Sequence, residues 1–573
     1  MMKAKKTISV ALAGLLCAGA LTGSLAGCGK KKISGANALE VYACSLGYGH
    51  EFLTKALEDF SKKEYVKNKY PNLQYSLTTN DEYEFGQAQV LSGATSLDLV
   101  FTSSFSPSTV EATGKNGKKS ILEDLTDVFE SKVMDFNTGK NETDENGNEW
   151  TYAEKLEKGT PGILDYLAFE EENGDDVETH YYYTGGGSGV YGILYNKTKL
   201  VEYGYLTEDA NGNIKGLPRT TKEMKAFAVK IANGGHVPFI SSKGTGYWTR
   251  VQNLWWAQYE GAEAYDRYFQ GQYQNDEGDW VQGVEVLSRA KGRYIANQTT
   301  ESYLKYDNEP RLIYDESAAL DFTTAQSYLV SGKGLMQANG TWFDQEMKTL
   351  EGQEGADAEI RLMPDLMISE IIDVVPNKSI ADDAELSALV GAIASGSTEI
   401  KGTFEGVAYD VTQADFDRVK EAHNLFNTGE SLSPTIIPSY SDAIPLAKDF
   451  LRYLATDEYC RQYLETTGGN SPAFYYDVEK KAPELFASFS PMQKDRLTQI
   501  QGKAAILKYK TVNYPLVYRT GYSSFGSGFE IKYFAKNAKD RMSAKDCIDN
   551  QIAQYTANNN ELWNLMLSQA GLK

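Results

Sequence analysis

The sequence is poor in the residues from which metal sites and catalytic nucleophiles are most often built. Its 573 residues include only 5 cysteines and 4 histidines, and the histidines are scattered. No cysteine spacing matches a zinc knuckle, and neither an HExxH nor a GxSxG motif occurs. We therefore expect no metal and no cofactor. An enzyme built on this chain would have to draw its catalytic pair from Asp and Glu residues.

Positive charge is also in short supply. The chain has 57 Lys and Arg residues against 78 Asp and Glu residues, which gives a net charge of −21. Such a surface repels phosphate backbones and anionic lipid headgroups, so nucleic acid and a membrane bound by charge are disfavoured as partners. Tyrosine, in contrast, is frequent, with 38 residues. Its apolar ring and hydrogen-bonding tip suit polyol ligands.

The N-terminus has the features of a secretory signal. Three lysines precede an apolar run over residues 8–21, which is too short to span a bilayer as a stable helix. The run is followed by LAGC at residues 25–28, which resembles the bacterial lipobox, whose cysteine sulfur carries a diacylglycerol. We predict a lipoprotein signal peptide over residues 1–27, lipidation at Cys28, a tether over residues 28–38, and anchoring at the outer face of the cytoplasmic membrane. A plain signal peptide with an incidental cysteine is the alternative.

Three cysteines lie beyond the lipobox: Cys44, Cys460 and Cys547. Three cysteines cannot all pair within one chain, and the sequence does not say whether any pair forms. We expect buried free thiols.

The N-terminal part of the mature chain alternates between strand and helix patterns. Residues 39–44 alternate like a strand, and the apolar residues between 52 and 60 share one helical face. Two further strands are predicted at residues 72–78 and 97–101. This βαβ order is typical of a mostly parallel sheet, whose ligands bind beyond the carboxyl ends of the strands.

Two loops follow strands at that edge, over residues 45–50 and 102–106. Their polar and aromatic side chains are therefore candidate ligand contacts: Tyr48, His50, Ser103 and Ser104.

A glycine-rich entry into an apolar strand marks residues 184–200 as an interdomain crossing. Within it, GILYNKTKL at residues 192–200 resembles the G-x-x-Y-N-K-x-x-L signature of the extracellular solute-binding proteins of sugar ABC transporters. Thr220 and Glu223 form a capping box that resembles the P-x-T-x-x-E element of the same family.

The resemblance continues toward the C-terminus in the same order. Residues 321–342 resemble F-x-x-G-x-x-A-M-x-x-x-G-x-W, residues 447–455 resemble A-x-x-F-[IL]-x-[FY]-L, and residues 467–472 resemble the terminal G-x-x-P turn. Residues 370–430 match no element of the family and are predicted to be an insertion.

The family resemblance implies that Trp342 stacks on a sugar ring. One face of a pyranose is a patch of C–H groups that lies flat on an indole, while its hydroxyls reach polar partners. Two glycines precede Tyr247 and Trp248, and this pattern is typical of a loop that presents aromatic rings to a ligand. Trp255 and Trp256 are instead expected in the core. The remaining candidates for ligand contact are Asn339 and Asn470.

The resemblance implies an α/β fold of the two-lobed periplasmic-binding-protein-like type II class, with hinge-crossing strands near residues 104, 184–195 and 434. Lobe 1 is predicted to comprise residues 39–105 and about 434–475, and lobe 2 residues 106–433 and about 476–573.

The function implied is capture of a carbohydrate, in particular an oligosaccharide, by a monomer that is not an enzyme, followed by delivery to the permease subunits of an ABC importer. Two alternatives remain open: a surface-anchored glycoside hydrolase or polysaccharide lyase, and the same fold binding a peptide or an organic ion. A lone arginine near the ring-presenting loop, Arg250, favours a neutral ligand. The sequence does not tell which sugar is bound or which permease is served.

Overall fold

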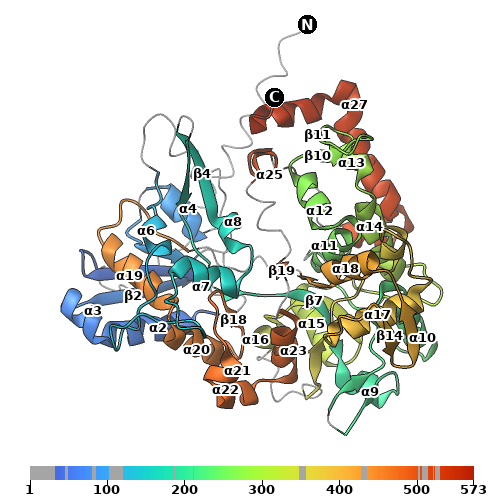
Figure 1. Cartoon of the computed structure of the whole chain (residues 1–573), viewed down its shortest axis with the longest axis horizontal. Coiled ribbons are helices and arrows are strands. Elements are labelled where there is room, and N and C mark those ends of the chain that lie inside the picture. Colours follow the sequence, from blue (N-terminus) through green and yellow to red (C-terminus); the bar gives the residue numbers. More distant parts are fainter. Residues whose placement is uncertain are drawn as a thin grey trace.

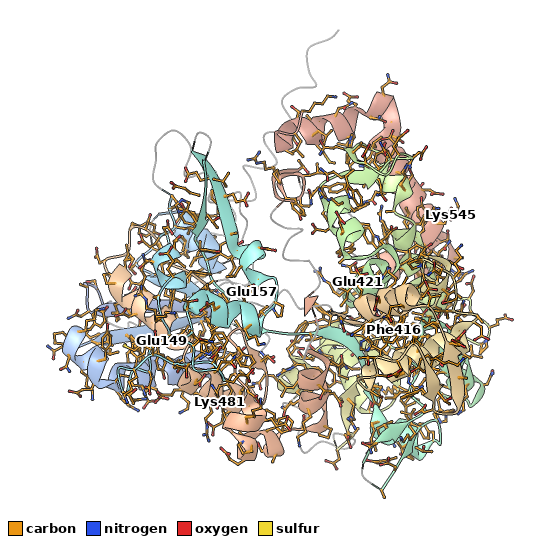
Figure 2. All side chains as sticks on the ribbon, in the orientation of Figure 1. Glu149, Glu157, Phe416, Glu421, Lys481 and Lys545 are labelled. Carbon is orange, nitrogen blue, oxygen red and sulfur yellow. The ribbon has the colours of Figure 1, made fainter. Side chains whose placement is uncertain are left out.

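Two sheets with separate hydrophobic cores divide the computed structural model into two lobes, on the left and the right of Figure 1. In Figure 2, Glu149 and Glu157 lie on lobe 1, and Phe416 and Glu421 lie on lobe 2. The structure describes residues 33–44, 49–80, 85–93, 95–101, 120–173, 176–185, 187–210, 212–244, 246–347, 357–426, 435–500, 504–505, 514–520, 522 and 529–573.

A four-stranded sheet with the order β17-β3-β1-β2 forms the centre of lobe 1. β1 (Ala38–Cys44) pairs in parallel with β2 (Gln74–Asn80) and β3 (Leu99–Phe101), whereas β17 (Thr435–Ile436) is antiparallel to β3. The parallel sheet predicted from the βαβ order is therefore confirmed. Gly49 and His50, just before α2, lie at the site described below.

The helix predicted after β1 is α2 (Glu51–Lys62), which buries its apolar face against the sheet and against α19 (Ile444–Leu454). Phe60 of α2 lies edge-on to Phe450 of α19, with ring centroids 5.2 Å apart. The other helices that accompany this sheet are α3 (Glu64–Lys69), α4 (Phe85–Leu91) and α20 (Asp457–Thr466).

Residues 122–190 contribute to the core of lobe 1, so the structure differs from the lobe boundary predicted at residue 105. Phe129 and Tyr152 lie in one core with Phe450, and the Tyr152 hydroxyl is 2.9 Å from Thr184 Oγ1. The elements of this segment are too short to show a clear apolar period, which is why the sequence did not reveal where they pack. They are α6 (Thr126–Phe129), α7 (Tyr152–Gly159), α8 (Ile163–Leu167), β4 (Ala168–Asn173) and β5 (Asp176–Tyr181).

Lobe 2 is built on a three-stranded sheet with the order β12-β7-β13. The central strand β7 (Tyr191–Asn196) pairs antiparallel with β12 (Met336–Gly340) and with β13 (Ile360–Leu362). Trp255 and Trp256 are each about 1% exposed in the core of this lobe, as predicted.

Many helices and short hairpins surround this sheet. From residue 197 to residue 347 they are α9 (Lys197–Glu202), β8 (Thr207–Glu208), β9 (Ile214–Lys215), α10 (Thr221–Asn233), α11 (Tyr247–Glu260), α12 (Ala262–Phe269), β10 (Gln272–Gln274), β11 (Trp280–Gln282), α13 (Val286–Arg289), α14 (Lys291–Leu304), α15 (Phe322–Val330) and α16 (Phe343–Met347). From residue 369 to residue 426 they are η3 (Ser369–Asp373), α17 (Asp383–Ala394), β14 (Lys401–Phe404), β15 (Val407–Asp410), α18 (Gln413–His423) and β16 (Leu425–Phe426).

The C-terminal part of the chain first follows the hinge and then returns to lobe 2. The elements near the hinge are α21 (Val478–Lys481), α22 (Pro483–Ser488), α23 (Pro491–Ile500) and β19 (Ala504–Ala505). Those that pack on lobe 2 are α25 (Pro515–Thr520), α26 (Phe529–Phe534), η4 (Ala538–Asp540) and α27 (Ala544–Ala570). Figure 1 shows α27 along the top and outer side of that lobe.

Backbone pairing holds the crossing segments together at the hinge. Thr184 and Thr435 exchange two N–H to carbonyl hydrogen bonds of 3.0 and 2.7 Å. β6 (Gly187–Ser188) pairs with β18 (Ser471–Pro472). Val190 still belongs to the core of lobe 1, while the next residue begins β7, so the chain crosses within the predicted segment 184–195. The crossings predicted near residues 104 and 434 lie outside the described residues.

Few reactive groups lie in the described parts of the chain. The thiols of Cys460 and Cys547 are free and buried, as expected, whereas Cys44 is only half-buried. Burial raises the pKa of the Cys460 thiol to about 12 and that of Cys547 to about 11, so neither is a thiolate near neutral pH. The same residues contain no helix with the length and apolar character needed to cross a membrane, and no group of three or more side chains placed to hold a metal ion.

The Y-N-K motif has a structural role that explains its residue types. Asn196 ends β7 fully buried, and its Oδ1 accepts the Lys199 N–H at 2.9 Å, which caps α9. Its Nδ2 donates to the carbonyls of Leu329 and Val330 at the end of α15, at 2.9 and 3.0 Å. One side chain therefore satisfies the ends of two helices beside the central strand.

We expect Asn196→Ala to lower the free energy of unfolding by about 3 kcal/mol, because it removes a helix cap and leaves two carbonyls buried without donors. Urea unfolding measures this loss. The control is Asp321→Ala, which removes only the exposed cap of α15 and should cost about 1 kcal/mol. Equal losses in the two variants would show that the bonds to the carbonyls of residues 329 and 330 contribute nothing.

Candidate ligand-binding site

Three aromatic rings gather where β12 and β7 meet the hinge. In the register of these strands Gly340 is opposite Tyr191, so Trp342 follows the strand end directly beside Tyr191. The indole lies edge-on to the Tyr191 ring, with centroids 5.0 Å apart and planes at 90°. Tyr247, the first residue of α11, lies 5.9 Å from both rings. Residues that are far apart in the sequence thus form one ring cluster: Tyr191, Tyr247 and Trp342.

The position of the Trp342 ring depends on the glycine two residues before it. A Cβ atom on Gly340 would lie 2.1 Å from Cη2 of the indole, so the ring folds back over the strand only because residue 340 has no side chain. This accounts for the glycine in the G-x-W motif. Trp342 is 6% exposed and Tyr191 7% exposed, while Tyr247 is half-buried.

A single cation accompanies the rings in this part of the described structure. Arg250 lies three residues after Tyr247 on α11, with its guanidinium carbon 5.7 Å from the centroid of Tyr191. A guanidinium at this distance interacts favourably with the ring face and also offers donors to ligand oxygens.

The segment after β1 brings lobe 1 to the same place. Gly49 adopts a left-handed conformation, and a Cβ atom there would lie 4.0 Å from Nε2 of Gln345 on α16, three residues after Trp342. His50 is half-buried at the N-cap of α2, and its carbonyl accepts the N–H groups of the first turn. Oε1 of Gln345 is buried, and the described residues place no hydrogen-bond donor on it. A ligand hydroxyl at this interface would therefore meet an available acceptor.

Glu346, next on α16, has a raised pKa for a carboxyl group. Burial raises its pKa from 4.5 to about 7, although the Gln326 amide donates a 2.6 Å hydrogen bond to the carboxylate. The protonated form is favoured in the folded state.

A raised acid pKa contributes stability that is complete below the unfolded value of 4.5 and is lost as the pH rises through 7. We therefore expect Glu346→Gln to match the wild type near pH 4.5 and to exceed its free energy of unfolding by about 2 kcal/mol near pH 8. Urea unfolding across this range measures the difference. A difference in the free energy of unfolding between the two proteins that does not change with pH would contradict a raised pKa at Glu346.

Three of the predicted ligand contacts are placed elsewhere by the structure. Trp248 is 1% exposed and packs on Phe239 and Tyr303, because one step along α11 turns it by about 100° away from the ring cluster and into the core. Asn339 is fully buried and uses its oxygen for the N–H of the next residue. It therefore shapes the strand end. Both residues therefore have structural roles in lobe 2.

Asn470 is likewise a structural residue in the turn before β18. It is 1% exposed, donates to the Tyr463 hydroxyl at 2.9 Å, and accepts from Arg496 of α23 at 2.7 Å. Both polar ends of its side chain are thus engaged between lobe 1 and α23. Four other predicted sites lie outside the described residues: Cys28, Tyr48, Ser103 and Ser104.

The sequence missed two members of the site, Tyr191 and Gln345. The sequence could have predicted Tyr191, because this residue begins the crossing strand and lies near the hinge when that strand pairs antiparallel with residues 336–340. Gln345 had none, because one amide three residues after Trp342 is indistinguishable from an ordinary helix surface.

No protein-family model and no curated protein sequence matches this chain at a significant level. Among solved structures, a chitin oligosaccharide binding protein matches 92% of this chain and 100% of its own, with 12% sequence identity and a TM-score of 0.50. The chain has the two-lobed type II fold of solute-binding proteins. RafE in complex with raffinose (14% identity, 92% and 99% coverage) and a probable secreted solute-binding lipoprotein from Streptomyces coelicolor (11% identity, 92% and 100% coverage) both give TM-scores of 0.49.

The type II fold predicted from the sequence is therefore shown. At these identities the comparison establishes architecture and leaves function to the chemistry of the site. The ring cluster and Gln345 of lobe 2 lie opposite Gly49 of lobe 1, where a Cβ atom would be 4.0 Å from Nε2 of Gln345.

Proposed function

We propose that this protein captures a carbohydrate between its two lobes and delivers it to a membrane importer. The observation that carries the proposal is the ring cluster of lobe 2 beside the segment at Gly49 of lobe 1. An indole and two phenol rings suit the apolar C–H face of a pyranose. Gln345, Arg250 and the tyrosine hydroxyls supply polar partners for its oxygens.

A neutral oligosaccharide is the ligand class that these groups fit best. The cluster has one arginine rather than the paired, forked arrangement that a carboxylate or phosphate ligand requires. The chitin oligosaccharide binding protein that shares the fold is consistent with a glycan of more than one unit.

The mechanism follows from ligand contacts on both lobes. A glycan that touches both lobes adds contacts only when they approach each other, so it shifts the open–closed equilibrium toward the closed form. We propose that the chain is a monomer held at the outer face of the cytoplasmic membrane by a lipid on Cys28, and that the permease recognises the closed form. In this scheme the protein performs no chemistry on the sugar.

A thermal-shift screen of residues 29–573 against neutral oligosaccharides tests this function, with reducing ends assayed in the same wells. Binding to the native state alone raises the unfolding midpoint with ligand concentration. We expect a shift for one glycan family with no release of reducing ends. Release of reducing ends would make the protein a glycoside hydrolase, and unsaturated products would make it a lyase. Shifts confined to peptides or organic ions would replace the ligand class.

A further inference from the structure

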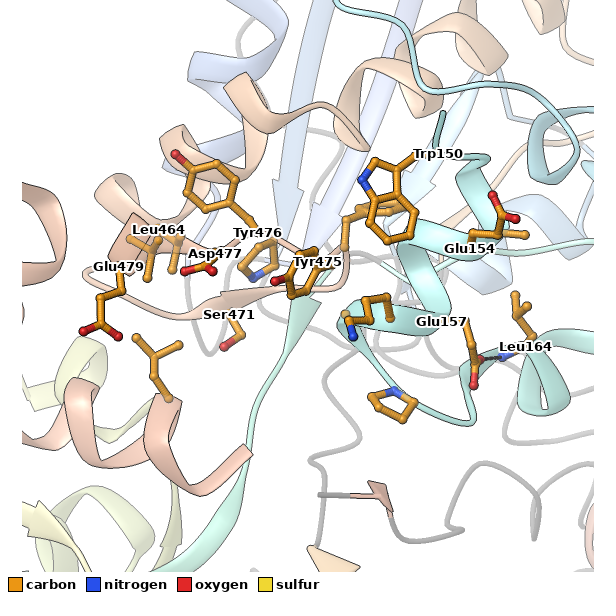
Figure 3. Close-up of a pocket in the computed structure, with 18 of the residues that line it drawn as sticks. Trp150, Glu154, Glu157, Leu164, Leu464, Ser471, Tyr475, Tyr476, Asp477 and Glu479 are labelled. Carbon is orange, nitrogen blue, oxygen red and sulfur yellow. Dashed lines mark hydrogen bonds between the residues drawn. The ribbon is translucent and has the colours of Figure 1, made fainter. Parts of the chain in front are cut away.

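A cavity of about 810 Å³ lies at the hinge and shares no residue with the ring cluster. Its walls come from α7 and the residue before its N-cap, from the hinge strand β18, and from the segment that leads into α21. Figure 3 shows Trp150 and Tyr475 facing the same opening. The volume falls within the range of ordinary small-molecule sites.

The walls of this hinge cavity are mainly apolar and aromatic. The rings of Trp150 and Tyr475 are both half-buried, with centroids 6.1 Å apart and planes at 50°, so they form two sides of a corner. Tyr476 and Phe486 add further ring surface. A second cavity of about 260 Å³ shares Trp150 and Tyr475 and extends toward residues 143–146.

The charges around the hinge cavity are mostly negative. Among the described residues that line it, four are acidic and only Lys158 is basic; the acids are Glu154, Glu157, Asp477 and Glu479. In Figure 3, the first two lie on one side of the cavity and the last two on the other. One of the four acids, Asp477, is paired at 2.9 Å with Lys480 of the smaller cavity, and Lys481 of that cavity is paired with Asp457.

Hydrogen bonds to the chain fix two of these carboxylates in place. Glu157 accepts the N–H of Gly162 at 2.7 Å and that of Leu164 at 3.1 Å, and Glu154 accepts from Thr151 at 2.8 Å. The bonds from Thr151 also lower the pKa of Glu154, so this carboxylate is charged at neutral pH.

The aromatic corner already attracts a cation. The ammonium group of Lys158 lies 5.5 Å from the centroid of Tyr475, at a distance typical of cation–π contacts. Lys158 itself is exposed, so an incoming cation can displace it without uncovering buried charge. An anion, in contrast, would meet Glu154, Glu157 and Glu479 in addition to the paired Asp477.

The cavity spans elements that belong to different lobes. Trp150 and Lys158 belong to lobe 1, whereas Leu497 is on α23, which is fastened to lobe 2. On that helix Asp495 is paired with Arg361 of β13, and Gln499 donates to the carbonyl of Met363 at 2.8 Å. The same helix is also held to lobe 1, because Arg496 donates to Asn470 at 2.7 Å and Leu497 packs with Leu464 of α20. The hinge cavity therefore adjoins the helix that joins the two lobes.

We propose that the hinge cavity binds an organic ammonium ion that carries an apolar ring, and that this ligand is coupled to lobe closure. The ring fills the corner of Trp150 and Tyr475, and the ammonium faces the surrounding carboxylates. The occupant contacts α23, which joins the two lobes, so the coupling requires that lobe closure shift α23 against the other walls of the cavity. The coupling rests on the proposed capture of a glycan by closure, whereas the binding itself does not.

Three probes that differ mainly in charge test the binding: phenethylammonium, 2-phenylethanol and 3-phenylpropionate. Isothermal titration calorimetry on residues 29–573, without glycan, should give phenethylammonium roughly tenfold tighter binding than 2-phenylethanol and the weakest binding for 3-phenylpropionate. Equal affinities for the first two probes would overturn the ligand class. Binding of none of them would overturn the site.

Variants locate the binding. Trp150→Ala should weaken phenethylammonium at least fivefold, and Glu479→Gln, at an exposed position, should weaken it without changing 2-phenylethanol. The control is Tyr75→Ala, on an exposed aromatic of β2 outside the cavity, which should change neither. Circular dichroism checks that each variant is folded. Binding that ignores both Trp150 and Glu479 would place the probe elsewhere and contradict the proposal.

A second titration tests the coupling. With phenethylammonium at saturation, the dissociation constant of the glycan found in the screen should change by about fivefold, and saturating glycan should change that of phenethylammonium by the same factor. Unchanged constants would overturn the coupling. Binding of phenethylammonium that depends on Trp150, together with no binding of any glycan, would leave the cavity site standing and remove the proposed glycan function.

Discussion

Replacing Trp342 with alanine is expected to weaken glycan binding about a hundredfold, the largest change in affinity that we predict. The indole forms the centre of the ring cluster, and truncation of a central aromatic anchor costs about 2–4 kcal/mol of binding free energy in typical interfaces. The same variant should lose about 3 kcal/mol of stability, because Trp342 is only 6% exposed and its loss leaves a cavity. Calorimetric titration with the glycan from the screen measures the first effect, and urea unfolding the second.

Two further variants separate affinity from stability. Trp342→Phe keeps an apolar ring in place, so it should weaken binding by about tenfold while stability falls by about 1 kcal/mol. The matched control is Trp248→Phe, because Trp248 belongs to the core of the same lobe and packs on Phe239 and Tyr303. It should lower stability and leave the glycan affinity within twofold. Equal affinity losses at positions 342 and 248 would show that the effect passes through stability alone.

Replacing Lys155 with methionine is expected to lower the free energy of unfolding by about 3–5 kcal/mol, the largest stability change that we predict. Lys155 is fully buried in lobe 1, where its ammonium donates to Glu142 at 2.5 Å and to Asp457 at 2.8 Å. The variant leaves two acidic side chains close together with little water. Urea unfolding at about pH 7.5 measures the loss.

The second substitution Glu142→Gln should restore part of the stability of Lys155→Met, because it removes the carboxylate that has lost its partner. Burial already raises the pKa of Glu142 in the wild type, and the loss of Lys155 would raise it further. Stability that depends on a raised acid pKa falls as the pH rises, so the deficit of the single variant should be smaller near pH 5 than near pH 7.5. No rescue and no pH dependence would show that Lys155 acts by packing alone.

The sequence predicted the features that rest on local patterns. The apolar face of residues 52–60, the parallel strands around β1, the helix N-cap at Thr220 and the buried pair Trp255 and Trp256 all appear as expected. The capping box is incomplete, because the Glu223 carboxylate accepts the N–H of Arg219 instead of that of Thr220. Each depends on periodicity or on spacing within a few residues, which the chain displays directly.

The features that the sequence did not predict depend on contacts between distant segments. Tyr247 and Trp248 look equivalent in sequence, but the first helical turn of α11 sends one to the ring cluster and the other to the core. The sequence predicts Asn470 as a ligand contact, but its amide donates to Tyr463 and accepts from Arg496, so both polar ends are engaged within the protein. The placement of residues 122–190 in lobe 1 likewise depends on their packing with α19.

Hydrogen–deuterium exchange with and without the glycan from the screen tests the central claim most directly. Capture between the lobes predicts slower exchange around Tyr191, at the start of α11 and over α16 in lobe 2, together with slower exchange at residues 49–54 of lobe 1. Protection confined to one lobe, or confined to the hinge cavity around Trp150 and Tyr475, would contradict capture of the glycan by closure of the two lobes.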